Sequence, residues 1–235
     1  MVEYAPLVAG ADNTQIDMTY DDGVSLGVVR TRLISGNAAD PALLDIDLAA
    51  PYDFGTVPTT GSAEVTFTIT NNGGVIATAM AGSGLALPFR FAGTGVYPGT
   101  TDPAACGATL APTATCEVVV EYLPTTTGLQ TDRMDISYEN GAGLTASTRN
   151  LRGTGGSPAT IVISETDPFD YGTLANTNSV TRIFTISNIG SVTADSLSIS
   201  LATGVEFDFD GAYPGAGGDC GSDLAPATAL SLIHI

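Results

Sequence analysis

Short runs in which apolar and polar residues alternate are the main pattern along this chain. In residues 64–70, EVTFTIT, every second side chain is apolar, so one face of an extended strand is apolar and the other polar. The run CEVVVEY at residues 116–122 has the same character. Glycine, proline and asparagine separate such runs, and signals for helices are scarce. The pattern therefore predicts an all-β protein.

A hairpin is predicted where two of these runs follow one another closely. Residues 133–138, RMDISY, and residues 144–151, LTASTRNL, flank an Asn140-Gly141 turn. About seven to nine short strands in roughly 115 residues are typical of an immunoglobulin-like β-sandwich. A unit of this length can bury a core of its own.

The chain repeats itself. PYDFGTV at residues 51–57 returns as PFDYGTL, and FTITNNG at residues 67–73 returns as FTISNIG, both 117 positions later. CGATLAP, which begins at Cys106, returns as CGSDLAP at Cys220. VEYAPLVAG at residues 2–10 and IDMTYDDG at residues 16–23 each precede a similar stretch by 118 positions. Internal repetition with this period indicates an array of similar units.

We therefore expect tandem immunoglobulin-like β-sandwiches, one complete and two truncated. Residues 1–40 form the C-terminal part of one repeat, residues 43–157 a complete repeat, and residues 158–229 the N-terminal part of a third. Residues 35–41 and 153–158 are interpreted as short linkers. The incomplete repeats are expected to expose a core face, whereas residues 43–157 should fold as a monomer.

The cysteines give the sharpest chemical prediction. Cys106 and Cys116 lie ten positions apart, and a disulfide between them would stabilise the fold by about 2–3 kcal/mol. Reduced thiols, or a Cys106–Cys220 bond, are the alternatives. In the third repeat the partner of Cys220 should fall at position 230, where Leu230 stands instead. We expect no strand beyond Ala229 and interpret residues 230–235 as a non-native tail, the alternative being a genuine divergent terminus.

Net charge excludes several classes of partner. The chain has seven arginines, no lysine and 25 acidic residues, for a formal net charge of −18. Such a surface repels phosphate, so neither nucleic acid nor an anionic membrane is expected as a partner. No apolar run approaches the roughly 18 residues that a membrane-spanning helix needs.

Four sequence motifs together carry a resemblance to a known family. DFGTV, FTITNNGG, CGATLAPTATC followed by VEYLPTTTG, and LRGTGG resemble the choice-of-anchor D repeat. That family is a bacterial relative of the immunoglobulin-like domains of abnormal-spindle and Hydin proteins. The resemblance implies tandem immunoglobulin-like domains in long secreted or surface-attached proteins. It brings no catalytic residues and no cofactor.

Catalytic and metal chemistry find little support in the residues. His234 is the only histidine, so a nucleophile–histidine arrangement has no base outside the last six residues. Three pairs of neighbouring carboxylates are interpreted as solvent-exposed: Asp21 and Asp22, Asp45 and Asp47, and Asp208 and Asp210. Residues 208–219 begin like a calcium loop but lack its further ligands. We therefore predict no catalytic, cofactor or metal site.

The expected function is a non-catalytic structural or interaction module on the bacterial cell surface or in a secreted protein. Its partners would be other immunoglobulin-like repeats of the same chain and, through exposed strands and loops, surface proteins or polysaccharides. One alternative is an accessory domain of a larger secreted enzyme, with polysaccharide binding as one version of that role. The chain has no tryptophan for a sugar-stacking platform, which argues against that version. A second alternative is an intracellular scaffold.

Overall fold

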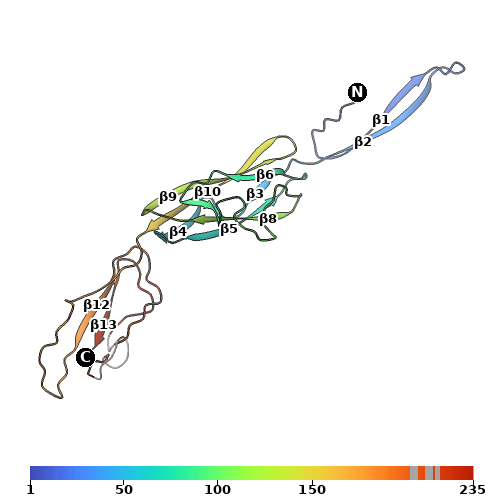
Figure 1. Ribbon diagram of the computed structural model, residues 1–235. Helices are drawn as coiled ribbons and strands as arrows, with labels where there is room; N and C mark the ends of the chain where they lie inside the picture. The colour runs from blue at the N-terminus through green and yellow to red at the C-terminus, as the bar shows by residue number, and fades with distance from the viewer. Residues whose placement is uncertain (202–205, 210–213, 215–217, 235) are drawn as a thin grey trace.

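A computed structural model describes residues 1–201, 206–209, 214 and 218–234 of the chain. Within these residues the regular elements are all strands, arranged in four sheets along an elongated molecule (Figure 1). The strands are β1 (Gly10–Tyr20), β2 (Val28–Ala38), β3 (Leu44–Ile46), β4 (Tyr52–Pro58), β5 (Ala63–Asn71), β6 (Thr78–Ser83), β7 (Phe89–Phe91), β8 (Thr115–Tyr122), β9 (Gly128–Glu139), β10 (Leu144–Gly156), β11 (Ile161–Ile163), β12 (Arg182–Asn188) and β13 (Ala229–His234). The predicted all-β class is confirmed.

The middle repeat is a sandwich of two four-stranded sheets. One sheet has the order β3-β5-β8-β7 and the other the order β4-β10-β9-β6. In the usual lettering these are strands A-B-E-D and A′-G-F-C, which is the immunoglobulin-like arrangement. Strand β4 runs parallel to β10, and the other pairs are antiparallel. The strand order alone therefore gives the immunoglobulin-like fold.

The core of this sandwich comes from the alternating positions that the sequence indicated. Phe67 and Ile69 of β5 are fully buried between the sheets, as are Val118 and Val120 of β8. The facing sheet contributes side chains that are almost as completely buried: Met134, Ile136, Tyr138 and Leu151. Each apolar side chain of this size contributes about 1.5–3 kcal/mol when it leaves water.

The predicted hairpin is also present, because β9 and β10 pair directly across residues 140–143. The side-chain oxygen of Asn140 accepts hydrogen bonds from the amides of Ala142 and Gly143, at 2.8 and 3.0 Å. Gly141 has a φ of 90°, a conformation that glycine adopts without steric cost.

An equivalent hairpin, β1–β2, lies at one end of the molecule (Figure 1). It keeps a local contact of the middle repeat. The ring of Tyr4 lies so close over Gly36 that a Cβ there would be 2.5 Å from it, and the ring of Tyr122 covers Gly153 in the same way. Tyr4 donates a hydrogen bond to Asp12, and Tyr122 donates one to Gln130, which lies 118 positions after Asp12.

At the other end, β11, β12 and β13 form a sheet that corresponds to strands A, B and E. Ile186 of β12 pairs with Leu230 in the register in which Ile69 pairs with Cys116. The expectation that no strand follows Ala229 is therefore wrong. Backbone pairing needs no cysteine, and the apolar Leu230 packs against Ile186 where a cysteine would otherwise lie.

Candidate functional site

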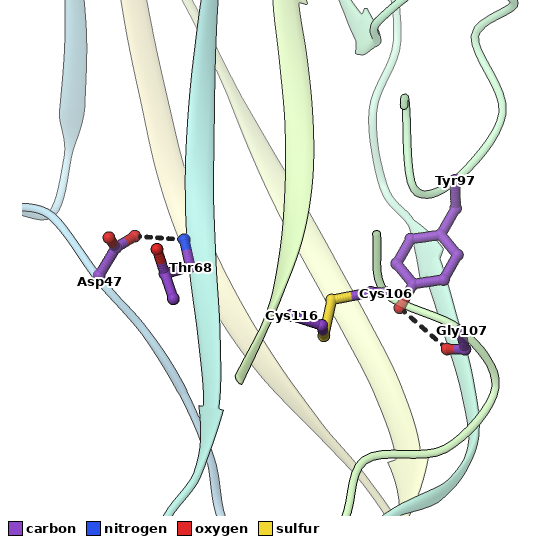
Figure 2. Close-up of a disulfide and its surroundings, with 6 residues drawn as sticks. All are labelled: Asp47, Thr68, Tyr97, Cys106, Gly107 and Cys116. Carbon is purple, nitrogen blue, oxygen red and sulfur yellow. Dashed lines mark hydrogen bonds between the residues drawn. A yellow bond between two sulfur atoms is a disulfide. The ribbon is translucent and has the colours of Figure 1, made fainter. Parts of the chain in front are cut away.

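A disulfide joins Cys106 to Cys116, the pair that the sequence predicted (Figure 2). Both residues are buried, and Cys116 lies at the start of β8. The amide of Cys106 donates to the carbonyl of Glu117, and the amide of Glu117 donates to the carbonyl of Ala104, each at 2.9 Å. The bond therefore fixes a loop along β8 and serves as a structural crosslink.

Tyr97 lies beside this loop, and its hydroxyl donates to the carbonyl of Gly107 at 3.4 Å (Figure 2). The ring meets Phe91 edge to face, with the centroids 5.8 Å apart. Burial raises the pKa of Tyr97 to about 12, because the phenolate would lose hydration. Tyr97 therefore stays protonated at neutral pH and acts as a packed, hydrogen-bonded ring.

Two surface hollows flank Tyr97, of about 680 and 600 Å³. Their walls are mainly small or apolar residues, with Glu64 in one and Arg90 in the other. A single carboxylate in one open hollow and a single guanidinium in the other do not form a general acid–base pair. Arg90 is in any case paired with Glu121 at 2.8 Å.

The carboxylate pairs do not come together as reacting groups. Asp45 is exposed on β3, whereas Asp47 accepts a hydrogen bond from the amide of Thr68 at 2.8 Å (Figure 2). Asp47 also donates from its own amide to the carbonyl of Thr68. Asp47 therefore extends the pairing between β3 and β5.

Asp21 and Asp22 bind backbone amides of their own loop. Asp22 accepts from Ser25 and Val24, and these amides hold the pKa of its carboxyl below the ordinary value. Asp21 accepts from the amide of Gly27 at 3.0 Å. Both carboxylates therefore shape the turn between β1 and β2.

The loop considered for calcium is only partly described. Asp208 is exposed, and Asp210 lies outside the described residues. Asp219 accepts hydrogen bonds from the amide and hydroxyl of Ser231, at 2.5 and 3.1 Å. His234 is the last residue of β13. Over the part of the chain that the structure describes, no three His, Cys, Asp or Glu side chains gather as a metal site.

The sequence predicts short linkers at the junctions between repeats, but it did not indicate the contacts that hold these linkers in place. At the second junction, the amide of Ser191 donates to the carbonyl of Ser157 at 3.1 Å, and the amide of Ser157 donates to the hydroxyl of Ser191 at 2.5 Å. The backbone of Gly190 lies against Pro158, where a Cβ would be 2.2 Å from the proline carbonyl oxygen. The linker is therefore held against the repeat that follows it.

The first junction has the same contacts 117 positions earlier in the chain. The amide of Gly74 donates to the carbonyl of Asp40 at 3.0 Å, and Gly73 lies against Pro41 with the same 2.2 Å approach. The amide of Ala42 also donates to the carbonyl at position 140 of the β9–β10 turn. The recurrence of glycine in NNGG and NIGS was the signal that could have indicated this contact.

No protein-family model matches the chain, and no curated protein matches it either. Among solved structures, the chain is similar to the VesB protease of Vibrio cholerae with 18% identity and a TM-score of 0.38, over 47% of this chain and 31% of that one. It thus spans less than a third of the VesB chain.

Two further similar structures show the same low level of likeness. The ASH/PapD-like domain 7 of human CEP192 has 17% identity and a TM-score of 0.34, over 48% of this chain and 84% of that one. A protein of unknown function from Porphyromonas gingivalis W83 has 10% identity and a TM-score of 0.36, over 64% of this chain and 68% of that one.

In the described part of the chain, no helix is long and apolar enough to cross a membrane.

Proposed function

We propose that this chain is a non-catalytic structural and interaction module, a stretch of a tandem immunoglobulin-like stalk in a bacterial secreted or cell-surface protein. The observation that carries the proposal is the repeated junction. The same contacts, Pro41 on Gly73 and Pro158 on Gly190, fix the linker to the following repeat at two places in the chain. A spacer needs such contacts, because they convert short linkers into stiff connections.

The arrangement of the repeats supports the same role. The two marked termini lie at opposite ends of an elongated molecule (Figure 1). Gly156, the last residue of β10, lies at the contact itself, where a Cβ would meet Thr56 on one side and Ser191 and Val192 on the other. Each repeat thus adds length and little freedom, which suits a module that carries another domain away from a surface.

The disulfide and the charge support a location outside the cytoplasm. Disulfides such as Cys106–Cys116 persist in oxidising environments, outside the cell or in the periplasm. A net charge of −18 keeps such a chain solvated and away from phosphate-rich partners. The partners of this module are then neighbouring repeats and, through exposed loops, surface proteins or polysaccharides. The family that fits these properties is the choice-of-anchor D repeat.

Intact-cell proteolysis tests the proposal in the source bacterium. An antibody against this chain would follow its digestion by an external protease, and thiol labelling under denaturing conditions would report whether Cys106 and Cys116 are joined. We expect digestion on intact cells, or release into the medium, with the pair oxidised. A chain that is protected until lysis, with all three thiols reduced, would contradict the proposal and favour an intracellular scaffold.

A further inference from the structure

Two asparagines of the middle repeat precede a glycine, Asn72 before Gly73 and Asn140 before Gly141. An Asn-Gly pair can lose ammonia when the amide nitrogen of the glycine attacks the side-chain carbonyl carbon of the asparagine. Glycine permits this attack because it has no Cβ to cover its nitrogen. The two pairs are alike in sequence, but the structure places them in different surroundings.

The amide of Gly73 is engaged in a buried contact. It donates to Oδ1 of Asn71 at 3.0 Å. The backbone of Gly73 also lies against Pro41, where a Cβ would be 2.2 Å from the proline carbonyl oxygen. Attack on the side chain of Asn72 therefore requires this part of the first junction to open beforehand.

Gly141 lies in the exposed turn between β9 and β10, and its amide donates to no acceptor among the described residues. Oδ1 of Asn140 accepts from the amides of Ala142 and Gly143, at 2.8 and 3.0 Å. Negative charge develops on this oxygen when the Gly141 nitrogen attacks, and the two amides are placed to stabilise it as oxyanion donors do. The turn thus combines an unengaged nitrogen with a polarised carbonyl group.

The β1–β2 hairpin carries an aspartate in the equivalent turn. Asp22 lies 118 positions before Asn140, and its Oδ1 accepts from the amides of Val24 and Ser25, at 2.9 and 2.7 Å. The glycine that follows has a φ of 88°, against 90° in the middle repeat. These amides, that of Ser25 most, hold the pKa of the Asp22 carboxyl below its ordinary value, so they favour negative charge on the oxygen. An aspartate at position 140 therefore fits the turn.

The β9–β10 turn is also part of the first junction. The main-chain carbonyl of Asn140 accepts from the amide of Ala42 at 2.9 Å, directly after Pro41 of the linker. In Figure 1 this turn lies at the end of the middle sandwich that faces the β1–β2 hairpin. A change in the main chain at position 140 therefore alters the contact with the linker.

We propose that Asn140 is a site of spontaneous modification, at which the chain converts its own asparagine to aspartate and isoaspartate and so changes the first junction with age. The Gly141 nitrogen forms a bond to Cγ of Asn140, and the bond between Cγ and Nδ2 breaks. Nδ2 leaves as ammonia and carries away the proton that Gly141 loses. Water then opens the resulting five-membered imide at one of its two carbonyl carbons.

The two products affect the junction differently. Addition of water at Cγ gives aspartate and leaves the main chain intact, as in the turn of Asp22. Addition at the main-chain carbonyl carbon gives isoaspartate, in which the chain runs through the former side chain. The oxygen that bound the amide of Ala42 then belongs to a carboxylate outside the main chain, so isoaspartate removes the contact with the linker.

Peptide mapping by mass spectrometry of the full chain, aged in mildly alkaline buffer, tests the site. Trypsin cuts after Arg133 and Arg149, which isolates Asn140 in one peptide. We expect Asn140 of the folded chain to deamidate about 10-fold or more faster than Asn72, because the glycine after Asn72 must first leave its hydrogen bond. In denaturant the two rates should become similar.

Equal rates in the folded chain, faster reaction at Asn72, or no reaction at Asn140 would overturn the proposal. A preference for Asn140 that persists unchanged in denaturant would do the same, because it would come from the flanking sequence and not from the turn.

Hydrogen exchange at the amide of Ala42 tests the effect on the junction. The isoaspartate fraction of the aged chain is compared with fresh chain and with freshly prepared Asn140→Asp, the matched control that carries aspartate alone. We expect exchange about 10-fold or more faster in the isoaspartate fraction, because the amide loses its acceptor, and unchanged exchange in Asn140→Asp. An isoaspartate fraction that protects Ala42 as the fresh chain does, or an Asn140→Asp chain that loses this protection, would contradict the proposal.

Discussion

Asn188 repeats the hydrogen bonds of Asn71, 117 positions earlier. The amide nitrogen of Asn71 donates to the carbonyls of Val75 and Leu110, at 2.9 and 3.0 Å. Its oxygen accepts from the amides of Leu43 and Gly73, at 3.2 and 3.0 Å. Asn71 thus joins the end of β5 to three other segments of the sandwich.

Asn188 makes the equivalent hydrogen bonds, and their lengths differ from those of Asn71 by at most 0.1 Å. Its amide nitrogen donates to the carbonyls of Val192 at 2.8 Å and Leu224 at 3.0 Å. Its oxygen accepts from the amides of Thr160 at 3.2 Å and Gly190 at 3.0 Å. Both asparagines are buried, at 0% and 1% exposure. A buried amide with all these partners fixes the turn that contacts the preceding linker. The same asparagine therefore stabilises both the sandwich and the junction.

Asn71→Ala should therefore be among the costliest substitutions in the middle repeat. It leaves two carbonyls and two amides without the partner they have now, and we expect a loss of about 3–5 kcal/mol. Native-state hydrogen exchange of β5 and β8 in increasing denaturant measures this loss. Asn72→Ala, at the exposed neighbour, is the control and should change stability by less than about 0.5 kcal/mol. Equal effects at the two positions would contradict the assignment.

Removal of the disulfide should destabilise the middle repeat by about 2–3 kcal/mol, because the unfolded chain regains the freedom of a ten-residue loop. Thermal unfolding with and without a reductant measures this. The melting temperature of the unmodified chain should fall by roughly 10 °C on reduction. A chain with both Cys106→Ala and Cys116→Ala should melt at the lower temperature under either condition. An unmodified chain that is insensitive to the reductant would show that the bond adds no stability.

The thiol of Cys220 should react slowly with alkylating reagents in the folded chain. It is 7% exposed, and its Sγ donates to the carbonyl of Ser231 at 3.2 Å. Burial raises the pKa of the Cys220 thiol, and the nearby Asp219 carboxylate raises it further, so little reactive thiolate forms at neutral pH. Iodoacetamide should label the folded chain slowly and the denatured, unreduced chain rapidly, with one equivalent. Rapid labelling of the folded chain would contradict this burial.

Alkaline pH should destabilise the middle repeat in part through Tyr97. Its pKa is raised from 10.0 to about 12 in the folded chain, so folding holds the proton more tightly than the unfolded chain does. The contribution is full below about pH 10 and is lost as the pH rises toward about 12. Denaturant midpoints at about pH 8 and about pH 11 should differ less in Tyr97→Phe than in the unmodified chain. Equal differences in the two chains would show that Tyr97 is not protected from ionisation.

Much of the sandwich could be predicted from the sequence, because the sequence signals for these features are local. Alternation placed Phe67 and Ile69 in the core, the Asn140-Gly141 turn located a hairpin, and the recurrence of cysteine indicated the Cys106–Cys116 bond. Each of these signals lies within a few residues of the feature that it predicts.

The features that the sequence did not predict depend on contacts between residues far apart in the chain. Strand β13 forms although Leu230 replaces the expected cysteine, since β12 offers it a paired edge. Residues 169–175 have nearly the sequence of β4 yet form no strand, since no equivalent of β10 lies beside them among the described residues. The tight approach of Pro158 to Gly190 is likewise a tertiary contact, which a glycine in the sequence permits without requiring it.

Small-angle X-ray scattering tests most directly whether the junctions make this chain a stiff spacer. The unmodified chain would be compared with the same chain carrying a four-residue Gly-Ser insertion between Ser157 and Pro158. We expect one rigid, elongated arrangement to fit the first scattering profile, whereas the second should require an ensemble of bent shapes. Identical profiles, or an ensemble already needed without the insertion, would contradict it.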